Sequence, residues 1–319
     1  MNTTGKVTAF AVTLAAAFAG AYGIGAAAEP VDQEPKKTEA HDTHAGKKED
    51  KGNKGDKGGG GSEAAPEPPG GLQVSDGGYR LDLRTPRVSA GEKEELRFTV
   101  RDKKGRALKA YEEEQTKELH LIVASRDLGT YRHLHPERDK SGEWSVRAEL
   151  PRAGDYRLLA DFVPHGASEG LTLGADLAAE GEYEPKALPQ PTRTVAAEDG
   201  YRVRLEGNLK AGQERKLTLN VTKDGKPVSG GLQPYLGASG HLVALRAGDL
   251  GYLHVHPSGA SGSRVSFMAT APTEGSYRLF LDFKHGDEVR TAAFTVDAGG
   301  GTVKSEGTHG SEESGGHGH

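Results

Sequence analysis

Two stretches of the chain carry the same three-histidine pattern, in which a lone histidine stands thirteen residues before a His-x-His-Pro motif. Imidazole is costly to bury without a partner and is the commonest metal ligand near neutral pH. Three imidazoles with an open fourth position suit Zn²⁺ or Cu²⁺. The repeated pattern therefore predicts a metal site that is built twice. The six candidate ligands are His120, His133 and His135 in the first copy and His241, His254 and His256 in the second.

Each pattern fits an antiparallel hairpin that gathers its histidines on one face. In the second copy, a turn centred near Gly248–Asp249 places His241 opposite His256. A turn near Asp127–Leu128 does the same in the first copy, where the lone histidine faces the second histidine of the His-x-His pair. Facing residues have Cβ atoms about 5 Å apart, and alternate residues share a face. We therefore expect each set to cluster, although a slip of one residue in register would break the pairing.

The residues around these patterns restrict the chemistry further. The chain has no cysteine, which excludes disulfides, thiolate ligands, cysteine nucleophiles and a blue-copper centre. Only Met1 and Met268 supply thioethers, so a methionine-rich Cu(I) site is also excluded. Asp161 and Asp282 precede phenylalanines on a neighbouring strand, where either carboxylate could hydrogen-bond a ligand imidazole.

The histidines also have a purely structural interpretation. Histidines on a sheet face are often packed core residues that bond to aspartate or to each other. Duplication copies such a feature as faithfully as it copies a binding site. Two further histidines, His165 and His285, lie in later loops and align only to within one residue. Five more lie in polar tracts and could bind metal only weakly: His41, His44, His309, His317 and His319.

The repeat extends well beyond the histidines. Gly78–Leu83 matches Gly200–Leu205, and Gly154–Phe162 matches Gly275–Phe283, at a nearly constant offset of about 121 positions. An offset preserved over such a span indicates duplication of a whole domain. We therefore expect two copies of one fold.

The local pattern in each copy is that of β-strands. Leu96, Phe98 and Val100 alternate with polar neighbours, and Gly-containing turn signals separate such runs. About seven short strands per copy are typical of an immunoglobulin-like or cupredoxin-like sandwich, and the Gly-x-Tyr sequences at Tyr156 and Tyr277 resemble its tyrosine corner. In the first copy we expect strands near residues 79–84, 94–101, 118–124, 131–135, 144–150, 155–163 and 171–177.

The composition divides the chain into unequal parts. Val7–Ala28 is an uncharged apolar stretch that ends in alanines, so it suits either a cleaved signal peptide or a single-pass anchor. The polar tracts on either side of the repeats have too few apolar residues to fold. The expected parts are the signal peptide or anchor (1–28), a disordered linker (29–72), a first sandwich (73–182), a proline-containing linker (183–198), a second sandwich (199–298) and a disordered His/Gly tail (299–319).

The charge of the chain bears on its partners. The 319 residues carry a formal net charge of −5, with Lys and Glu interspersed. Nucleic-acid binding would need a basic patch or stripe, so we expect no nucleic-acid partner. The expected contacts are a metal ion, the membrane if the N-terminal segment is retained, and an unidentified protein partner. We expect the folded part outside the cytoplasm, secreted or anchored to the outer face of the cell membrane.

One segment carries a resemblance to a known group of proteins. Gln233–Pro257, with its Tyr-Leu-Gly-Ala-Ser-Gly-His run and closing His-Val-His-Pro, looks like a signature of an uncharacterised family of exported actinobacterial proteins. Members of that family resemble this chain in having an apolar N-terminal segment, a low-complexity tract and two such domains. Some carry labels such as secreted or heavy-metal-binding protein. The resemblance implies an exported location and two tandem sandwiches, and no particular activity.

These observations favour an exported protein that is not an enzyme. We expect it to bind Cu²⁺ or Zn²⁺ through the histidine hairpins and to hold or deliver the metal at the cell surface. The alternative is a structural or partner-binding tandem module whose histidines are packed core residues. Gly166–Gly170 fits the Gly-x-Ser-x-Gly pattern of serine hydrolases, but that pattern requires a strand, a sharp turn and a helix. Here it falls in an expected loop between two strands.

Overall fold

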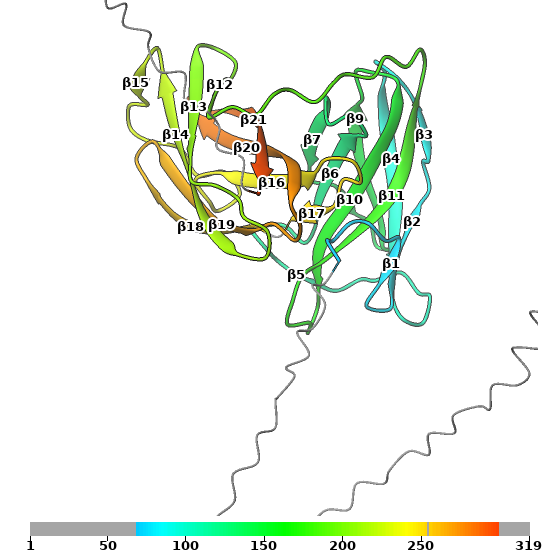
Figure 1. Cartoon of the computed structure of the whole chain (residues 1–319). Helices are drawn as coiled ribbons and strands as arrows, with labels where there is room; N and C mark the ends of the chain where they lie inside the picture. The colour runs from blue at the N-terminus through cyan, green and yellow to red at the C-terminus, as the bar shows by residue number, and fades with distance from the viewer. Residues whose placement is uncertain (1–67, 254, 300–319) are drawn as a thin grey trace, which may run out of the picture. The chain divides into compact units, whose positions relative to one another are not determined.

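The computed structural model describes residues 68–253 and 255–299, and all regular elements in these ranges are β-strands (Figure 1). Among these residues there is no helix of the length and apolar character needed to span a membrane. The expected leader or anchor, the linker that follows it up to residue 67, and the tail from residue 300 lie outside the described residues.

The first repeat forms two sheets that face each other. Their strand orders are β1-β2-β4-β9-β8 and β3-β11-β10-β6-β7, and β5 pairs with the end of β10. The strands are β1 (Ser75–Asp76), β2 (Tyr79–Leu83), β3 (Arg87–Ser89), β4 (Lys93–Arg101), β5 (Tyr111–Glu112), β6 (His120–Ser125), β7 (Tyr131–Leu134), β8 (Glu137–Arg138), β9 (Glu143–Glu149), β10 (Gly154–Pro164) and β11 (Leu171–Glu180).

The second repeat has the corresponding pair of sheets. Their orders are β12-β13-β14-β19-β18, with β15 on β14, and β17-β16-β20-β21. The strands are β12 (Thr194–Ala196), β13 (Tyr201–Glu206), β14 (Glu214–Lys223), β15 (Lys226–Pro227), β16 (His241–Arg246), β17 (Tyr252–Leu253), β18 (Val255–Ser261), β19 (Arg264–Thr270), β20 (Gly275–His285) and β21 (Glu288–Ala298).

The strand orders are those of an immunoglobulin-like sandwich. In the first repeat, β2-β4-β9-β8 follows the order A-B-E-D, and β6, β10 and β11 correspond to strands C, F and G. The tyrosine corner is present in both copies: the Tyr156 hydroxyl donates to the Arg152 carbonyl at 2.7 Å, and the Tyr277 hydroxyl donates to the Thr273 carbonyl at 2.8 Å. The predicted fold class of two tandem β-sandwiches is therefore confirmed.

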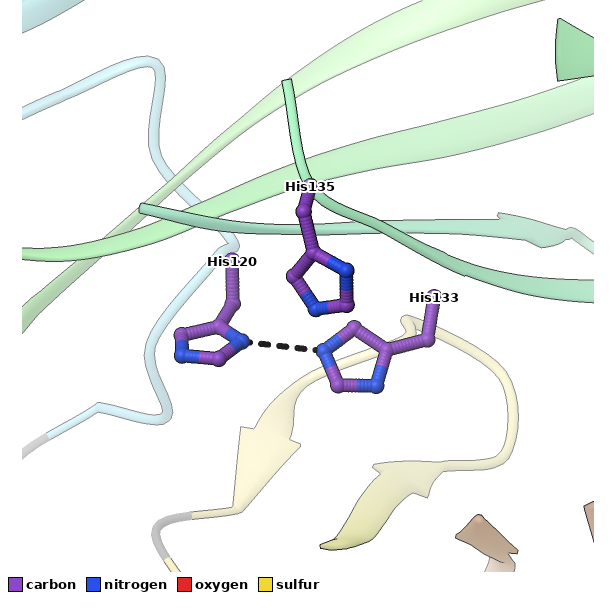
Figure 2. Close-up of side chains that lie close together, drawn as sticks. All are labelled: His120, His133 and His135. Carbon is purple, nitrogen blue, oxygen red and sulfur yellow. Dashed lines mark hydrogen bonds between the residues drawn. The ribbon is translucent and has the colours of Figure 1, made fainter. Parts of the chain in front are cut away.

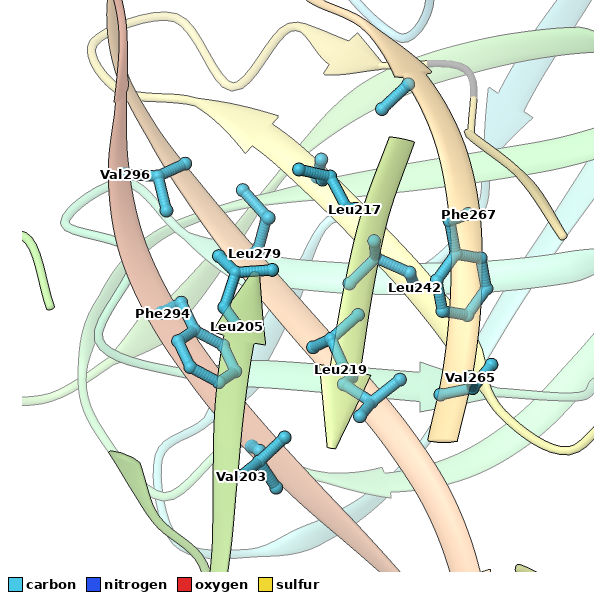
Figure 3. Close-up of a cluster of buried hydrophobic side chains, with 14 of the residues drawn as sticks. Val203, Leu205, Leu217, Leu219, Leu242, Val265, Phe267, Leu279, Phe294 and Val296 are labelled. Atoms are coloured by element: carbon cyan, nitrogen blue, oxygen red, sulfur yellow. The ribbon is translucent and has the colours of Figure 1, made fainter. Parts of the chain in front are cut away.

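Each repeat buries an apolar core between its own two sheets. The alternation of apolar and polar residues along the strands produces this core. Along β13, Tyr201, Val203 and Leu205 point inward while their neighbours are exposed. Figure 3 shows the core of the second repeat, where Phe294 and Leu279 from one sheet meet side chains of the other. This burial is the main source of stability for each sandwich.

A third apolar cluster joins the two repeats, which belong to one compact unit. All six residues of β6 are buried, because its odd-numbered side chains face the first core and its even-numbered side chains face the second repeat. Tyr131 stacks on Phe280 with ring centroids 4.1 Å apart and an interplanar angle of 4°. We call this surface the inter-repeat contact; its buried apolar residues are Ile122, Ala124, Leu128, Tyr131, Leu159, Val243, Leu245, Leu250 and Phe280.

Candidate functional site

The first predicted histidine set converges at the edge of the inter-repeat contact. The β6–β7 hairpin has the predicted register, with Leu121 opposite Leu134 and Ile122 opposite His133. One ring nitrogen from each of His120, His133 and His135 lies within 4.8 Å of the other two, as Figure 2 illustrates. Sequence spacing and turn position therefore brought these three imidazoles together as expected.

Two of the three imidazoles are oriented by bonds from their outer nitrogens. His120 Nε2 lies 3.0 Å from the Glu114 carbonyl oxygen, and His133 Nδ1 lies 3.0 Å from Asp282 Oδ2. Both oxygens only accept hydrogen bonds, so both outer nitrogens carry the proton. The inner nitrogens, His120 Nδ1 and His133 Nε2, lie at hydrogen-bond distance, 3.1 Å apart (Figure 2). With both outer nitrogens protonated, this bond needs one further proton on an inner nitrogen, and a metal cation bound by both nitrogens could take the place of that proton.

The third imidazole leaves a buried nitrogen unsatisfied. His135 Nε2 has no hydrogen-bond partner in the described part of the chain. Its ring centroid lies 4.8 Å from that of His133 and 5.3 Å from that of His120. Burial, followed by the neighbouring His133 and His120, lowers the pKa of His135 to about 3. The ring is therefore neutral at physiological pH and able to donate a lone pair.

His241 reaches the same cluster from the second repeat. Its ring centroid lies 6.0 Å from that of His120 and 5.7 Å from that of His133. Its Nε2 lies 2.8 Å from the Tyr235 carbonyl oxygen, which copies the bond that His120 makes in the first repeat. Burial lowers the pKa of His241 to about 4. Of the described members of the predicted second set, His241 is thus a buried imidazole beside the first set.

The predicted pairing of His241 with His256 is wrong. The second hairpin has the expected register as far as Leu253, which lies opposite Ala244. Beyond it, β18 belongs to the other sheet and places His256 opposite Met268, with the histidine exposed. The chain crosses to the other sheet after β17, whereas the predicted pairing assumes a hairpin that continues in the same sheet. His254 lies outside the described residues.

Histidines from both predicted sets border one cavity. Its volume is about 350 Å³, and it lies where the two repeats meet. The polar side chains at its wall include His120, His133, His241, His256 and Asp161. The two patterns that the sequence presents as separate sites therefore open onto a common space.

A reciprocal pair of tyrosine–aspartate bonds flanks the histidines. The Tyr131 hydroxyl donates to Asp282 Oδ2, and the Tyr252 hydroxyl donates to Asp161 Oδ2, each at 3.1 Å. Burial, followed by the nearby aspartates, raises the pKa of both tyrosines well above the usual value, so both hydroxyls stay protonated as donors. We call these two bonds the tyrosine clasp. Each joins one repeat to the other.

The aspartates were predicted from the sequence, whereas the tyrosines were not. Asp282 does hydrogen-bond an imidazole, as predicted, but that imidazole belongs to the other repeat. Asp161 bonds Tyr252 and Thr172 among the described residues. A signal for the tyrosines was present, because each stands two residues before the His-x-His motif in both copies.

Strained turns present the two carbonyls that hold the lone histidines. In the first repeat, Gln115 and Thr116 have φ values of 49° and 67°, and Glu114 pairs with Lys117 across them. Positive φ is unfavourable for residues other than glycine, most of all for a β-branched one such as threonine. The conformational strain is confined to this turn. The turn fixes the position of the Glu114 carbonyl oxygen, which accepts the bond from the His120 ring.

The remaining candidates lie elsewhere. His165 pairs with Glu112 at 2.7 Å and is largely exposed, while His285 accepts or donates a bond of 2.7 Å with Tyr201. Ser168, the centre of the Gly-x-Ser-x-Gly match, lies in the connection between the antiparallel strands β10 and β11, as expected. The five histidines of the polar tracts lie outside the described residues: His41, His44, His309, His317 and His319.

Several solved structures show a weak likeness to this chain. FdeC, an Escherichia coli adhesin, has a TM-score of 0.23 and 14% identity, with 71% of this chain and 65% of that chain covered. InvD of Yersinia pseudotuberculosis has a TM-score of 0.24 and 12% identity, with 73% and 62% covered. A marsupial T cell receptor has a TM-score of 0.22 and 12% identity, with 69% and 62% covered. The chain spans less than two thirds of each of these proteins, and at such TM-scores the likeness supports no inference.

Sequence comparison gives a firmer result at the level of the family. No curated protein is significantly similar to the chain. The model of one family, described as Domain of unknown function (DUF8832), matches residues 73–176 and again residues 194–300. This confirms the prediction of an uncharacterised family with two repeats, while its actinobacterial origin, exported location and histidine motifs stay predictions. Because the two matches cover most of the chain, the protein belongs to the DUF8832 family.

Proposed function

We propose that the protein is a non-catalytic binding module that acts outside the cytoplasm, with its two repeats held as one rigid unit. The observation that carries this proposal is the tyrosine clasp, in which each repeat supplies the acceptor for a tyrosine of the other. The apolar segment Val7–Ala28 supports export. In this role the buried His120 and His241 are core residues, each satisfied by a backbone carbonyl.

The energetics of the inter-repeat contact support a rigid unit. Hydrogen bonds to charged groups contribute about 1.5 to 3 kcal/mol each. The clasp contains two of them, and the stacked pair Tyr131–Phe280 adds packing to the apolar cluster around it. Two sandwiches connected only by a linker would lack both these hydrogen bonds and this packing. A fixed relative orientation would let a partner bind surfaces of both repeats at once.

The single tryptophan of the chain offers a direct test. Trp144 is buried in the core of the first repeat, so its fluorescence reports the unfolding of that repeat. Far-ultraviolet circular dichroism reports the unfolding of both repeats. In urea, the two signals of the full chain should change at the same midpoint, and they should separate in the double variant Tyr131→Phe/Tyr252→Phe. Two separate midpoints in the unmodified protein would contradict the rigid unit.

A second function is favoured by a specific observation at the histidines. His135 Nε2 is buried without a partner, beside two further imidazole nitrogens that lie 3.1 Å apart. The outer nitrogens of His120 and His133 donate to a carbonyl and a carboxylate, which is how metal-binding histidines are commonly held. These residues fit Zn²⁺ or Cu²⁺. We propose that they bind one such ion, to hold or deliver it at the cell surface.

Calorimetric titration with Zn²⁺ tests the metal proposal. The full chain is used with the five tract histidines replaced by asparagine, so that weak sites do not contribute. Replacing His120, His133 and His135 with asparagine should remove one equivalent, and His165→Asn should remove none. Affinity should fall in acid, because protonated imidazole cannot bind metal, and the lowered pKa values of His120 and His135 place that fall below the ordinary range of histidine. Absence of binding, or an unchanged triple variant, would contradict the proposal. The same titration measures whether His241, His254 and His256 bind a second ion, which stays a prediction.

A further inference from the structure

The hydrogen-bond partners of the converging histidines come from both repeats. His120 is oriented by the Glu114 carbonyl of its own repeat. His133, in contrast, is oriented by Asp282, which lies on β20 of the second repeat. The predicted ligands of the first set are therefore not held by the first repeat alone.

We propose that Asp282 is a positioning residue for the metal site of the first repeat, so that metal binding and docking of the two repeats are thermodynamically linked. This inference rests on the proposed metal-binding function. In place of a site contained within one sandwich, it describes a site whose ligand orientation is complete only when the two sandwiches are in contact. Asp282 itself does not touch the metal in this proposal; it acts through His133.

The surroundings of Asp282 fix its carboxylate in place. The residue is only 3% exposed. Oδ2 receives the His133 ring at 3.0 Å and the Tyr131 hydroxyl at 3.1 Å, and Oδ1 receives the Thr291 hydroxyl at 2.5 Å. A carboxylate held by three donors cannot rotate away from the imidazole. It therefore fixes the proton on Nδ1 and leaves Nε2 free as a more basic ligand.

The corresponding carboxylate of the first repeat is Asp161. Among the described residues, it accepts from Thr172 at 2.7 Å and from Tyr252 at 3.1 Å. The orientation of the His133 ring, in turn, depends on a residue of the second repeat. By linkage, an ion that binds only the docked arrangement must stabilise that arrangement.

The test measures Zn²⁺ affinity by competition with a chromophoric chelator, in the full chain with the tract histidines replaced. Asp282→Asn should weaken binding by about 10- to 100-fold, the usual cost of losing such a partner. Tyr131→Phe is the matched control, because it removes the other bond to the same carboxylate oxygen and crosses the same contact. It should leave affinity within about threefold. Melting temperatures in the presence of excess chelator report how much each variant destabilises the metal-free protein.

Each outcome decides a different question. If the unmodified chain does not bind Zn²⁺, the metal function fails and this inference with it. If the chain binds and Asp282→Asn binds equally well, the positioning role is overturned while the metal function stands. Equal losses in Asp282→Asn and Tyr131→Phe would assign the effect to loosened docking, which would overturn the positioning role of Asp282 and leave only the linkage. Should Asp282→Asn not fold, Thr291→Val takes its place, and unchanged affinity there counts against the proposal.

Discussion

The two repeats offer each other the same aspartate and tyrosine, and both tyrosine–aspartate bonds form, Tyr131 with Asp282 and Tyr252 with Asp161. Each aspartate also accepts from a threonine of its own repeat, Thr291 for Asp282 and Thr172 for Asp161. Duplication of a domain thus supplied both halves of a reciprocal contact. Among the described residues, the first repeat supplies His120, His133 and His135, and the second supplies the carboxylate that orients His133.

The outer edges of the repeats differ as well. In the first, β3 runs parallel to the end of β11, with Arg87 beside Ala178. In the second, none of the described strands pairs with that edge of β21, and a cavity of about 920 Å³ opens beside it. In this stretch of the second repeat, Gly207 has a φ of 96°, a left-handed conformation that an extended strand does not contain. The two copies thus differ in local backbone conformation at this edge.

The largest expected effect comes from the apolar part of the inter-repeat contact. Phe280→Ala should lower the free energy of unfolding by about 4 kcal/mol, through lost burial and a cavity. Its counterpart Leu159→Ala should cost less, about 3 kcal/mol, because only Phe280 also loses a stacked ring, that of Tyr131. Urea unfolding measures both.

Phe280→Ala should also uncouple the repeats. The Trp144 fluorescence midpoint and the circular dichroism midpoint, coincident in the unmodified chain, should separate in this variant. If Leu159→Ala proves the more damaging of the two, the contact depends on the first repeat more than the stacking geometry indicates.

An intermediate effect is expected from pH. Burial lowers the pKa of His120, His135 and His241 below the ordinary value, to about 3 for His135 and about 4 for His241. As pH falls from about 6.5 towards 4, these histidines bind protons in the unfolded chain but stay neutral in the folded chain. The free energy of unfolding therefore decreases over this pH range. The buried His241 alone should account for about 3 kcal/mol of this loss.

Urea unfolding at a series of pH values in the presence of chelator measures the effect. His241→Asn should flatten the profile between pH 6.5 and 4, whereas His256→Asn, at an exposed position, should leave it unchanged. A profile that is identical in His241→Asn and in the unmodified chain would show that this imidazole titrates normally and is not buried as described.

The smallest effect should come from the loss of a single clasp bond. Tyr131→Phe and Tyr252→Phe each remove one hydrogen bond to a carboxylate of the other repeat, so each should lower the free energy of unfolding by about 1.5 kcal/mol. Urea unfolding measures both. Clearly unequal costs for the two substitutions would contradict the reciprocal description of the clasp.

Most of the long strands and both hairpin registers were predictable from the sequence. The expected strand near 94–101 is observed as Lys93–Arg101, and that near 155–163 as Gly154–Pro164. The short strands β1, β3, β5 and β8 were missed, because two or three residues carry no recognisable alternation. In the site, the first set was found because a tight hairpin fixes which residues face each other. His256 was misplaced because the change of sheet after β17 depends on tertiary packing.

The sequence by itself determined two sandwiches, their duplication, and the convergence of His120, His133 and His135, since these follow from local alternation and turn position. Only the tertiary structure decided that the outer faces of β6 and β16 cover each other. The sequences of both strands are continuous apolar runs. Such a run indicates that both faces of the strand are buried, but it does not show which element covers the second face. This packing brought Asp282 to His133 and His241 to His120, because residues 149 and 121 positions apart in the chain become neighbours here only when the repeats dock.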